Sequence, residues 1–204
     1  MAEPSPPLLP AESLRRFVAE ALAKVGLPQS DAATCAELMV RADLLGADGH
    51  GVFRLPQYVR RIRGGAVNVN PKVRIAREAA GMALVDGDNG MGHVVMSFAA
   101  KTAIEKARSA GAAWVGVRNS NHAGPASLYA ARPLEHDMVG LYLAVGNANH
   151  MAPWGGIDLL LSTNPIAVAV PGSDGAIVLD MATSVAAYGK VKTAAQRGEA
   201  MPEG

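Results

Sequence analysis

Histidine and arginine lie close together in a glycine-rich stretch at residues 48–58, and this combination could handle a small organic acid. His50 precedes Arg54 by four residues, so the two side chains share one face if the stretch is helical. A histidine can give or take a proton near neutral pH, and an arginine can hold a carboxylate with two parallel hydrogen bonds. A capping histidine beside a surface arginine would give the same pattern, because a short motif is weak evidence by itself.

A second candidate loop, residues 118–125, contains Ser120, Asn121 and His122 and follows an apolar run that favours a strand. Loops between a strand and a helix often form ligand sites, because the strand end and the helix N-terminus face the same space. The alternative is a polar turn in which Asn121 or His122 caps the next helix.

A third candidate loop, residues 146–156, is rich in glycine and amide side chains and leads through residues 162–165 into another apolar run. Amide groups and glycine pairs suit the close approach of a flat polar ligand. An ordinary long connection is the alternative, although loops of this length in compact domains are often functional.

The elements that must position these loops change character near residue 71. Before it the pattern is helical: an apolar stripe at 14–25, a helix capped by Ser30 and running to Leu45, and a short basic helix at 57–63. After it, apolar runs alternate with helical patterns, which favours an α/β unit. We expect strands at 73–77, 82–86, 113–118, 138–145, 165–170 and 176–181, and helices at 92–109, 124–135 and 185–197.

Composition limits the classes of function. The 204 residues are 50% hydrophobic and 4% aromatic, with a formal net charge of +1, which excludes a disordered chain and disfavours nucleic acid as a partner. The single cysteine, Cys35, lies in a helical pattern and is expected to be a small buried hydrophobe. The pattern contains no membrane span and no signal peptide, so we expect a cytoplasmic protein with a disordered lead at residues 1–10.

Several well-known catalytic motifs do not occur in the sequence. The glycine fingerprint of Rossmann domains, the phosphate-binding P-loop, the H-E-x-x-H zinc motif and the G-x-S-x-G nucleophile motif are all missing. The histidines are scattered, so no catalytic metal is expected, and His93 and His136 are expected to cap or decorate helices. Residue chemistry alone thus supports a small-molecule α/β enzyme that uses histidine for acid–base chemistry, and it does not name the reaction.

Six blocks of sequence, taken together and in order, resemble the malate/L-lactate dehydrogenase family of the second type. That family also contains sulfolactate, ureidoglycolate and diketogulonate oxidoreductases and the reductases of piperideine carboxylate. The blocks cover residues 42–71, 85–95, 116–130, 162–171, 179–191 and 197–204.

The resemblance implies an NAD(P)-dependent oxidoreductase that interconverts a small 2-oxo or 2-imino acid and the corresponding 2-hydroxy acid, such as malate or lactate. It implies a helical domain at residues 11–71 and a mixed-sheet α/β nicotinamide-binding domain at 72–204 that is not a Rossmann fold. It also implies a cytoplasmic homodimer with a small-molecule substrate and no nucleic acid or membrane partner.

The resemblance also assigns candidate site residues. His50 and His122 are the catalytic candidates, and which of them donates the proton stays open, as does the choice between NADH and NADPH. Arg54 and Tyr58 are the candidates for binding the substrate carboxylate. The candidate cofactor contacts are Ser120, Asn147, Asn149, Thr163, Asn164, Asp180, Met181, Ala182, Thr183 and Ser184.

Two departures from the family pattern affect these expectations. Gly49 stands where the family usually has serine, which removes a hydroxyl from the pocket and affects substrate preference. Family members also continue well beyond the last block, so we expect a chain that is truncated at its C-terminus. A non-catalytic remnant or interaction module is therefore the main alternative, and a hydro-lyase or transferase using both histidines is a third.

Overall fold

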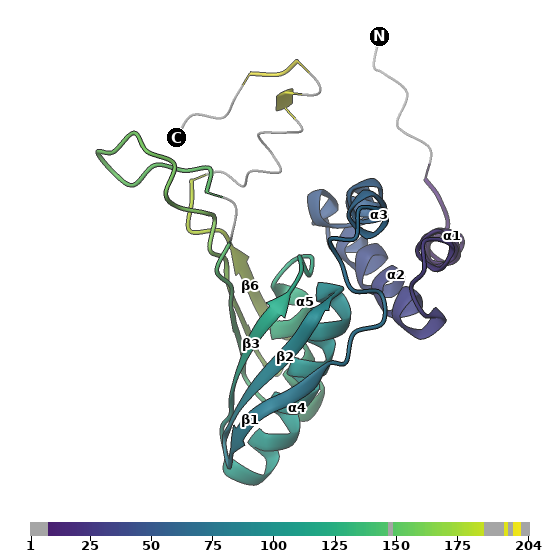
Figure 1. Ribbon diagram of the computed structural model, residues 1–204. Coiled ribbons are helices and arrows are strands. Elements are labelled where there is room, and N and C mark those ends of the chain that lie inside the picture. The colour runs from purple at the N-terminus through teal and green to yellow at the C-terminus, as the bar shows by residue number, and fades with distance from the viewer. Residues whose placement is uncertain (1–7, 147–148, 186–193, 196–197, 201–204) are drawn as a thin grey trace.

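A computed structural model describes residues 8–146, 149–185, 194–195 and 198–200 (Figure 1). Three helices come first: α1 (Ala11–Lys24), α2 (Gln29–Leu44) and α3 (Leu55–Arg63). Two 3₁₀ turns, η1 (Asp48–His50) and η2 (Val52–Arg54), connect α2 to α3. These helices enclose a core that includes Leu22, Met39 and Ile62.

The predicted burial of Cys35 is confirmed, because its side chain is fully buried in this helical core. Burial, with a smaller contribution from Asp31, raises the pKa of the Cys35 thiol to about 12. The predicted start of the second helix is two residues too late. Pro28, not Ser30, precedes α2, and Ser30 lies inside the helix, where its carbonyl accepts a hydrogen bond from Thr34.

All six predicted strands are present, within a few residues of their predicted bounds, and they form two separate sheets. The first sheet contains β1 (Arg74–Ala79), β2 (Met82–Gly90) and β3 (Trp114–Ser120) in that order. The β1–β2 pair is antiparallel and the β2–β3 pair is parallel, with α4 (Gly92–Ala110) as the crossover helix. The second sheet, β4 (Gly140–Leu143), β5 (Ile166–Val170) and β6 (Ile177–Met181), is antiparallel throughout. The prediction of a mixed α/β fold is confirmed.

The single helix predicted at 124–135 is wrong. The chain instead forms the short helix α5 (Ser127–Ala130), followed by the 3₁₀ turn η3 (Arg132–His136). Pro133 accounts for the break, because a proline inside a helix removes a backbone donor and its ring crowds the preceding turn. Most of the helix predicted at 185–197 lies outside the described residues.

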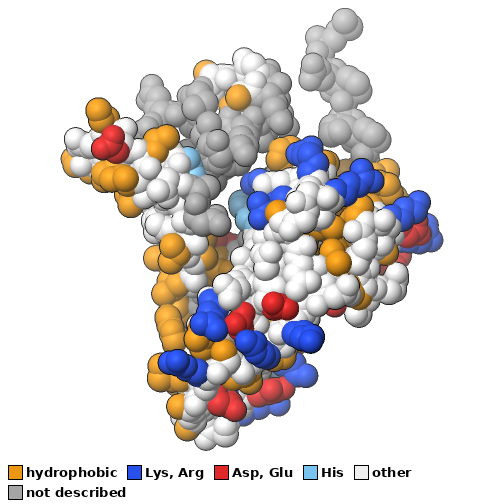
Figure 2. Space-filling model, viewed as in Figure 1, with side chains coloured by type: hydrophobic (Ala, Val, Ile, Leu, Met, Phe, Trp, Pro, Cys, Tyr) orange, Lys and Arg blue, Asp and Glu red, His pale blue; other side chains and the backbone are white. Residues whose placement is uncertain are grey.

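Each sheet has one face covered by helices and one face left open. Val85 of β2 packs on Val95 of α4, and Ala167 and Ala169 of β5 pack on the α5 region. On the open face of the second sheet, Leu141, Val168 and Leu179 lie side by side across the three strands. Figure 2 shows this apolar surface as a continuous orange band along the edge of the molecule. None of the described helices is long and apolar enough to cross a membrane.

Candidate active site

His50 lies at the end of the η1 turn, which is anchored to α2 by a carboxylate. The Asp43 side chain of α2 accepts a hydrogen bond from the backbone N–H of Val52 at 3.0 Å. Gly51 fits against this carboxylate so closely that a Cβ at this position would lie 1.8 Å from Asp43 Oδ1. The chain directly after His50 is therefore held against α2 by the Val52 hydrogen bond and by the close fit of Gly51.

Arg54 follows in the η2 turn, and its guanidinium is held by two neighbours. Its Nε donates to the carbonyl oxygen of Gly49 at 2.8 Å, and one terminal nitrogen donates to Gln57 Oε1 at 2.9 Å. No carboxylate among the described side chains lies within ion-pair distance of Arg54. A guanidinium fixed in this way keeps its charge available for a ligand anion.

His122 lies in the loop after β3, and this loop is fastened to the N-terminus of α4. The Asn121 amide donates to the carbonyl oxygens of Asn89 and Gly90, each at 2.9 Å. The first residue of α4, Gly92, lies directly against the loop backbone. A Cβ on Gly92 would lie 2.1 Å from the Asn121 carbonyl oxygen and 2.4 Å from that of His122.

The fold brings together all four residues predicted for catalysis and substrate binding. The rings of His50 and His122 are stacked, with centroids 5.6 Å apart and an angle of 14° between their planes. The Tyr58 hydroxyl of α3 lies 2.6 Å from His122 Nδ1, and Arg54 lies one helical turn before Tyr58. Figure 2 shows histidine surface bordered by basic side chains at the edge of the helical part of the molecule.

Electrostatics define the protonation state of this cluster. Burial raises the pKa of Tyr58 well above its ordinary value, so the phenol stays protonated. Desolvation, followed by the positive charges of His50 and Arg54, lowers the pKa of His122 below its ordinary 6.5. His122 is partly exposed to solvent, so water offsets part of the desolvation. Its pKa is still lowered, and the ring is therefore neutral at pH 7.

The tautomer of neutral His122 follows from its partners. The backbone N–H of Gly124 also points at Nδ1, at 3.4 Å, and an N–H can only donate. With the protonated Tyr58 hydroxyl on the same nitrogen, Nδ1 is a hydrogen-bond acceptor. Neutral His122 therefore carries its proton on Nε2, where the N–H can donate a hydrogen bond to a ligand oxygen.

His93 was missed as a site residue by the sequence reasoning, and the expectation that it caps or decorates α4 is wrong. Its side chain is fully buried, edge-to-face against Tyr58 with centroids 5.6 Å apart. Neither ring nitrogen has a hydrogen-bond partner among the described residues. Burial lowers the pKa of His93 to about 4, so the ring is neutral at pH 7. Its place beside Gly92 in the 85–95 block was the available signal.

The residues predicted to contact the cofactor form a second cluster at the β5 and β6 ends. The backbone N–H and the hydroxyl of Thr183 both donate to the Thr163 carbonyl oxygen, at 2.8 and 3.0 Å. Asn164 Oδ1 accepts the Gly146 N–H at 2.9 Å, and Met181 pairs with Ile166. Ala182 and Ser184 lie in the same stretch, partly buried.

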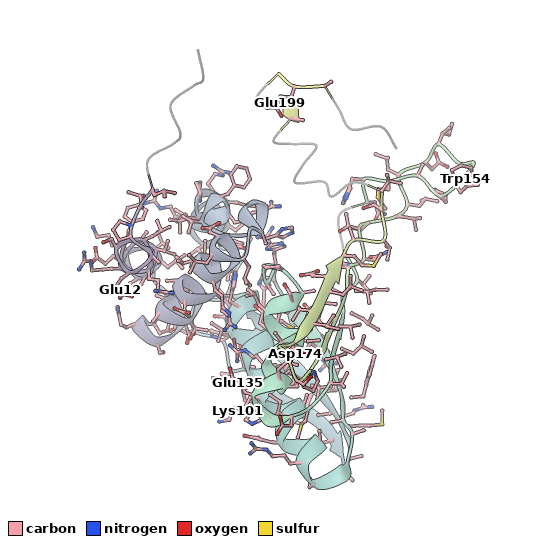
Figure 3. The ribbon with its side chains drawn as sticks, turned by 180° about the vertical axis from the view of Figure 1, so that it is seen from behind. Glu12, Lys101, Glu135, Trp154, Asp174 and Glu199 are labelled. Carbon is pink, nitrogen blue, oxygen red and sulfur yellow. The ribbon has the colours of Figure 1, made fainter. Side chains whose placement is uncertain are left out.

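Other predicted cofactor residues are placed differently. The Asp180 carboxylate accepts the backbone N–H of Ser127, the first residue of α5, at 2.7 Å, and so joins β6 to the segment that follows His122. Ser120 and Asn149 are exposed, and Asn147 lies outside the described residues. Residues 149–162 form a projecting arm closed by a Met151–Leu161 bridge, with Trp154 exposed at its tip, away from α1–α3 (Figure 3).

The chemistry of this second cluster fits a nicotinamide group. Its side chains are hydroxyls and an amide, and its one carboxylate, Asp180, is already bonded to Ser127. Neutral hydrogen-bonding groups of this kind suit the carboxamide of a nicotinamide ring, which has both a donor and an acceptor. Thr163, Asn164 and Thr183 are the residues that would hold it.

Comparisons with known proteins agree with the resemblance seen in the sequence blocks. The family model described as malate/L-lactate dehydrogenase matches residues 9–204. A malate dehydrogenase of Pyrococcus abyssi is 44% identical over 196 residues, which cover 96% of this chain and 54% of the relative. An L-sulfolactate dehydrogenase of Methanocaldococcus jannaschii is 38% identical over 197 residues, covering 97% and 57%.

Solved structures show the same likeness in three dimensions. The malate dehydrogenase of Pyrococcus horikoshii OT3 matches with a TM-score of 0.87 at 44% identity, over 90% of this chain and 53% of that chain. The sulfolactate dehydrogenase of Methanocaldococcus jannaschii matches with a TM-score of 0.89 at 38% identity, over 96% and 57%. The chain thus spans about half the length of the curated relatives it matches.

Proposed function

Because the chain belongs to the malate/L-lactate dehydrogenase family, we propose that it is part or all of a nicotinamide-dependent oxidoreductase that interconverts small 2-oxo and 2-hydroxy acids. The single observation that carries this proposal is the cluster of His50, Arg54, Tyr58 and His122, drawn from two distant parts of the chain. The cluster combines a carboxylate-binding group with two histidines, as the reaction of a 2-oxo acid requires.

Arg54 is proposed to bind the substrate carboxylate. Its guanidinium is fixed by Gly49 and Gln57 and can offer its remaining N–H groups as a fork to two carboxylate oxygens. Binding there orients the neighbouring C2 carbonyl toward the stacked histidines, an effect of position rather than of charge transfer. When bound, the nicotinamide supplies the hydride that reduces C2.

The two histidines are proposed to divide the remaining work. The His122 Nε2–H donates a hydrogen bond to the C2 oxygen and polarises it, with Nδ1 held by Tyr58. If His122 lost that proton, it would become an imidazolate or would need a proton from Tyr58, whose pKa is raised by burial. His122 is therefore proposed to donate a hydrogen bond and not to supply the transferred proton. His50, stacked beside it, is the proposed acid that delivers the proton to the oxygen in reduction and removes it in oxidation.

The first test is a titration with NADH and NADPH, followed by an absorbance assay of NAD(P)H oxidation with oxaloacetate and pyruvate. His50→Ala should lower turnover about 100-fold or more, the usual size of an acid–base contribution. His122→Ala should lower it by a similar factor, about 100-fold, the usual cost of removing one hydrogen-bond donor to a developing oxyanion. His136→Ala is the matched control, since this partly buried ring lies 2.8 Å from Arg108 and outside the cluster of His50, Arg54, Tyr58 and His122. Both site variants keeping activity within a few-fold of the parent would contradict the roles.

The alternative of a non-catalytic module predicts no saturable binding of either cofactor in the same titration. The expected domain division at residue 71, the non-Rossmann mode of cofactor binding and the homodimer belong to this proposal as well. A structure with cofactor bound tests the first two, and light scattering in solution tests the third.

A further inference from the structure

A row of three side chains on one face of the α3 segment faces the His122 loop. Arg54, Tyr58 and Arg61 follow each other at intervals of four and three residues, the spacing that places side chains in one row on a helix. Tyr58 contacts His122 at 2.6 Å, and the next member of the row, Arg61, donates to Asn121 Oδ1 at 2.9 Å. Successive turns of α3 therefore contact successive residues of the same loop.

Arg61 has no acidic partner among the described side chains, since none of their carboxylates lies within ion-pair distance of it. Asn121, which accepts its hydrogen bond, is neutral. Arg118 shows the contrast, because its guanidinium pairs with Asp86 at 3.0 Å. A guanidinium has five N–H groups, so Arg61 keeps donors for a ligand while the Asn121 contact holds it in place.

The charge of Arg61 acts at the candidate active site. It is one of the positive charges, together with Arg54, that lower the pKa of His122. Arg54 and Arg61 are separated by seven residues, roughly 10 Å along a helix. Arg61 contacts the His122 loop at Asn121, and Arg54 lies close enough for its charge to act on His122. One arginine suffices for one carboxylate, so a second unneutralised arginine here favours a ligand with two negative groups.

We infer that Arg61 binds a second anionic group of the substrate, so that this site selects 2-oxo and 2-hydroxy acids that carry two negative charges over those that carry one. The inference rests on the proposed function and adds a specificity residue to it. Arg54 holds the carboxylate next to C2, and Arg61 holds the carboxylate or other oxyanion at the far end of the molecule.

The test compares a dianionic with a monoanionic substrate in matched variants. Arg61→Gln should lower kcat/KM for oxaloacetate by about 10- to 100-fold, the size of a charge-assisted contact, and change kcat/KM for pyruvate by less than about 2-fold. Arg60→Gln is the control, because it removes the same charge from the neighbouring exposed position of α3. Arg61→Lys, which keeps the charge, should retain most of the preference for oxaloacetate.

Several outcomes would overturn the inference. Equal losses for both substrates in Arg61→Gln, or the same selective loss in Arg60→Gln, would show that Arg61 does not recognise a second anion. If Arg61→Lys behaved like Arg61→Gln, the contact with Asn121 would matter and the charge would not.

A binding experiment separates this inference from the proposed function. Malonate and acetate are titrated into the protein while the His122 ring signals are followed by NMR. Malonate should bind more tightly than acetate, and this preference should be lost in Arg61→Gln and kept in Arg60→Gln. That result supports the inference even if the protein turns over no 2-oxo acid. A failure of turnover would refute only the proposed function. If malonate does not bind, or if Arg61→Gln leaves its binding unchanged, the inference is overturned. The proposed function is not refuted by either result, because turnover of a 2-oxo acid is measured separately.

Discussion

Replacing Tyr58 by phenylalanine removes one oxygen atom and tests the proposed state of His122. The Tyr58 hydroxyl is the shorter of the two contacts on Nδ1, at 2.6 Å against 3.4 Å for the Gly124 N–H. Tyr58 is 3% exposed, so phenylalanine fills the same space. The change therefore deletes the hydrogen bond that fixes the tautomer and leaves the packing in place.

The expected size of the effect follows from the value of one hydrogen bond. A neutral intramolecular bond contributes about 1 kcal/mol to stability, which lowers Tm by roughly 3 °C in a chain of this length. If the same free energy holds the Nε2–H tautomer ready for the substrate oxygen, turnover falls about 5-fold, because 1.36 kcal/mol corresponds to a factor of ten. The KM for the acid should change little, since Arg54 is untouched.

Tyr129 of α5 provides a matched control. The Tyr129 hydroxyl is also buried and donates to the Ala123 carbonyl oxygen at 2.5 Å, next to His122 in sequence but not on its ring. Tyr129→Phe should cost a similar amount of stability and leave turnover and the His122 ring unchanged. This comparison separates an effect on the tautomer from a general loss of rigidity in the loop.

The direct assay is ¹⁵N NMR of the His122 ring in both variants and in the parent protein. In the parent, Nδ1 should be the unprotonated nitrogen at pH 7, and Tyr58→Phe should shift the population toward the other tautomer. If Nδ1 carries the proton in the parent, or if Tyr58→Phe leaves the ring signals unchanged, the reasoning about the donor role of His122 is wrong.

Three further predictions concern stability and selectivity. Gly92→Ala should lower the free energy of unfolding by about 3 kcal/mol in urea titrations, because its Cβ would meet the Asn121 and His122 carbonyl oxygens. Gly49→Ala is the control, since its Cβ meets no atom within 4 Å. Equal losses of stability in the two variants would contradict the packing argument. Burial lowers the pKa of His93 to about 4. Between pH 6.5 and 4 the unfolded chain therefore binds more protons at this histidine than the folded chain does. As the pH falls through this range, the folded protein loses about 3 kcal/mol of stability. His93→Leu should flatten that part of the pH profile, and an unchanged slope would refute the assignment. Gly49→Ser should leave Tm within about 1 °C and alter the ratio of kcat/KM for oxaloacetate and pyruvate; an unchanged ratio would show that position 49 does not face the substrate.

Much of the fold could be predicted from local pattern. The alternation of apolar runs located the strands, because a half-buried strand repeats every two residues and a helix does not. The helix predicted at 124–135 failed because one proline, Pro133, outweighed the periodicity around it. The division of six strands into two sheets was not predictable, since strand pairing depends on contacts between distant segments that no local pattern records.

The candidate site was predictable where its residues have distinctive chemistry. His50, Arg54 and His122 stand out by residue type and by their loops, and the structure brings them together. His93 and Arg61 were missed because their importance lies in where they pack. Residue type alone does not distinguish a histidine in a helix or an arginine among other arginines. Only the fold places His93 against Tyr58 and Arg61 beside Asn121.

The glycines around the two histidines imply an uneven capacity for change during evolution. A methyl group added at Gly51 would displace the Asp43 carboxylate that holds the Val52 N–H, and one added at Gly92 would displace the backbone of Asn121 and His122. At Gly49, in contrast, a Cβ would meet no atom within 4 Å, and the carbonyl oxygen that accepts the Arg54 hydrogen bond can be supplied by any residue. Under the proposed function, substitutions at position 49 are therefore expected to change the contacts to the substrate while His50 and His122 stay in place. A saturation library at the three positions should show this as broad tolerance at 49 beside near-complete intolerance at 51 and 92.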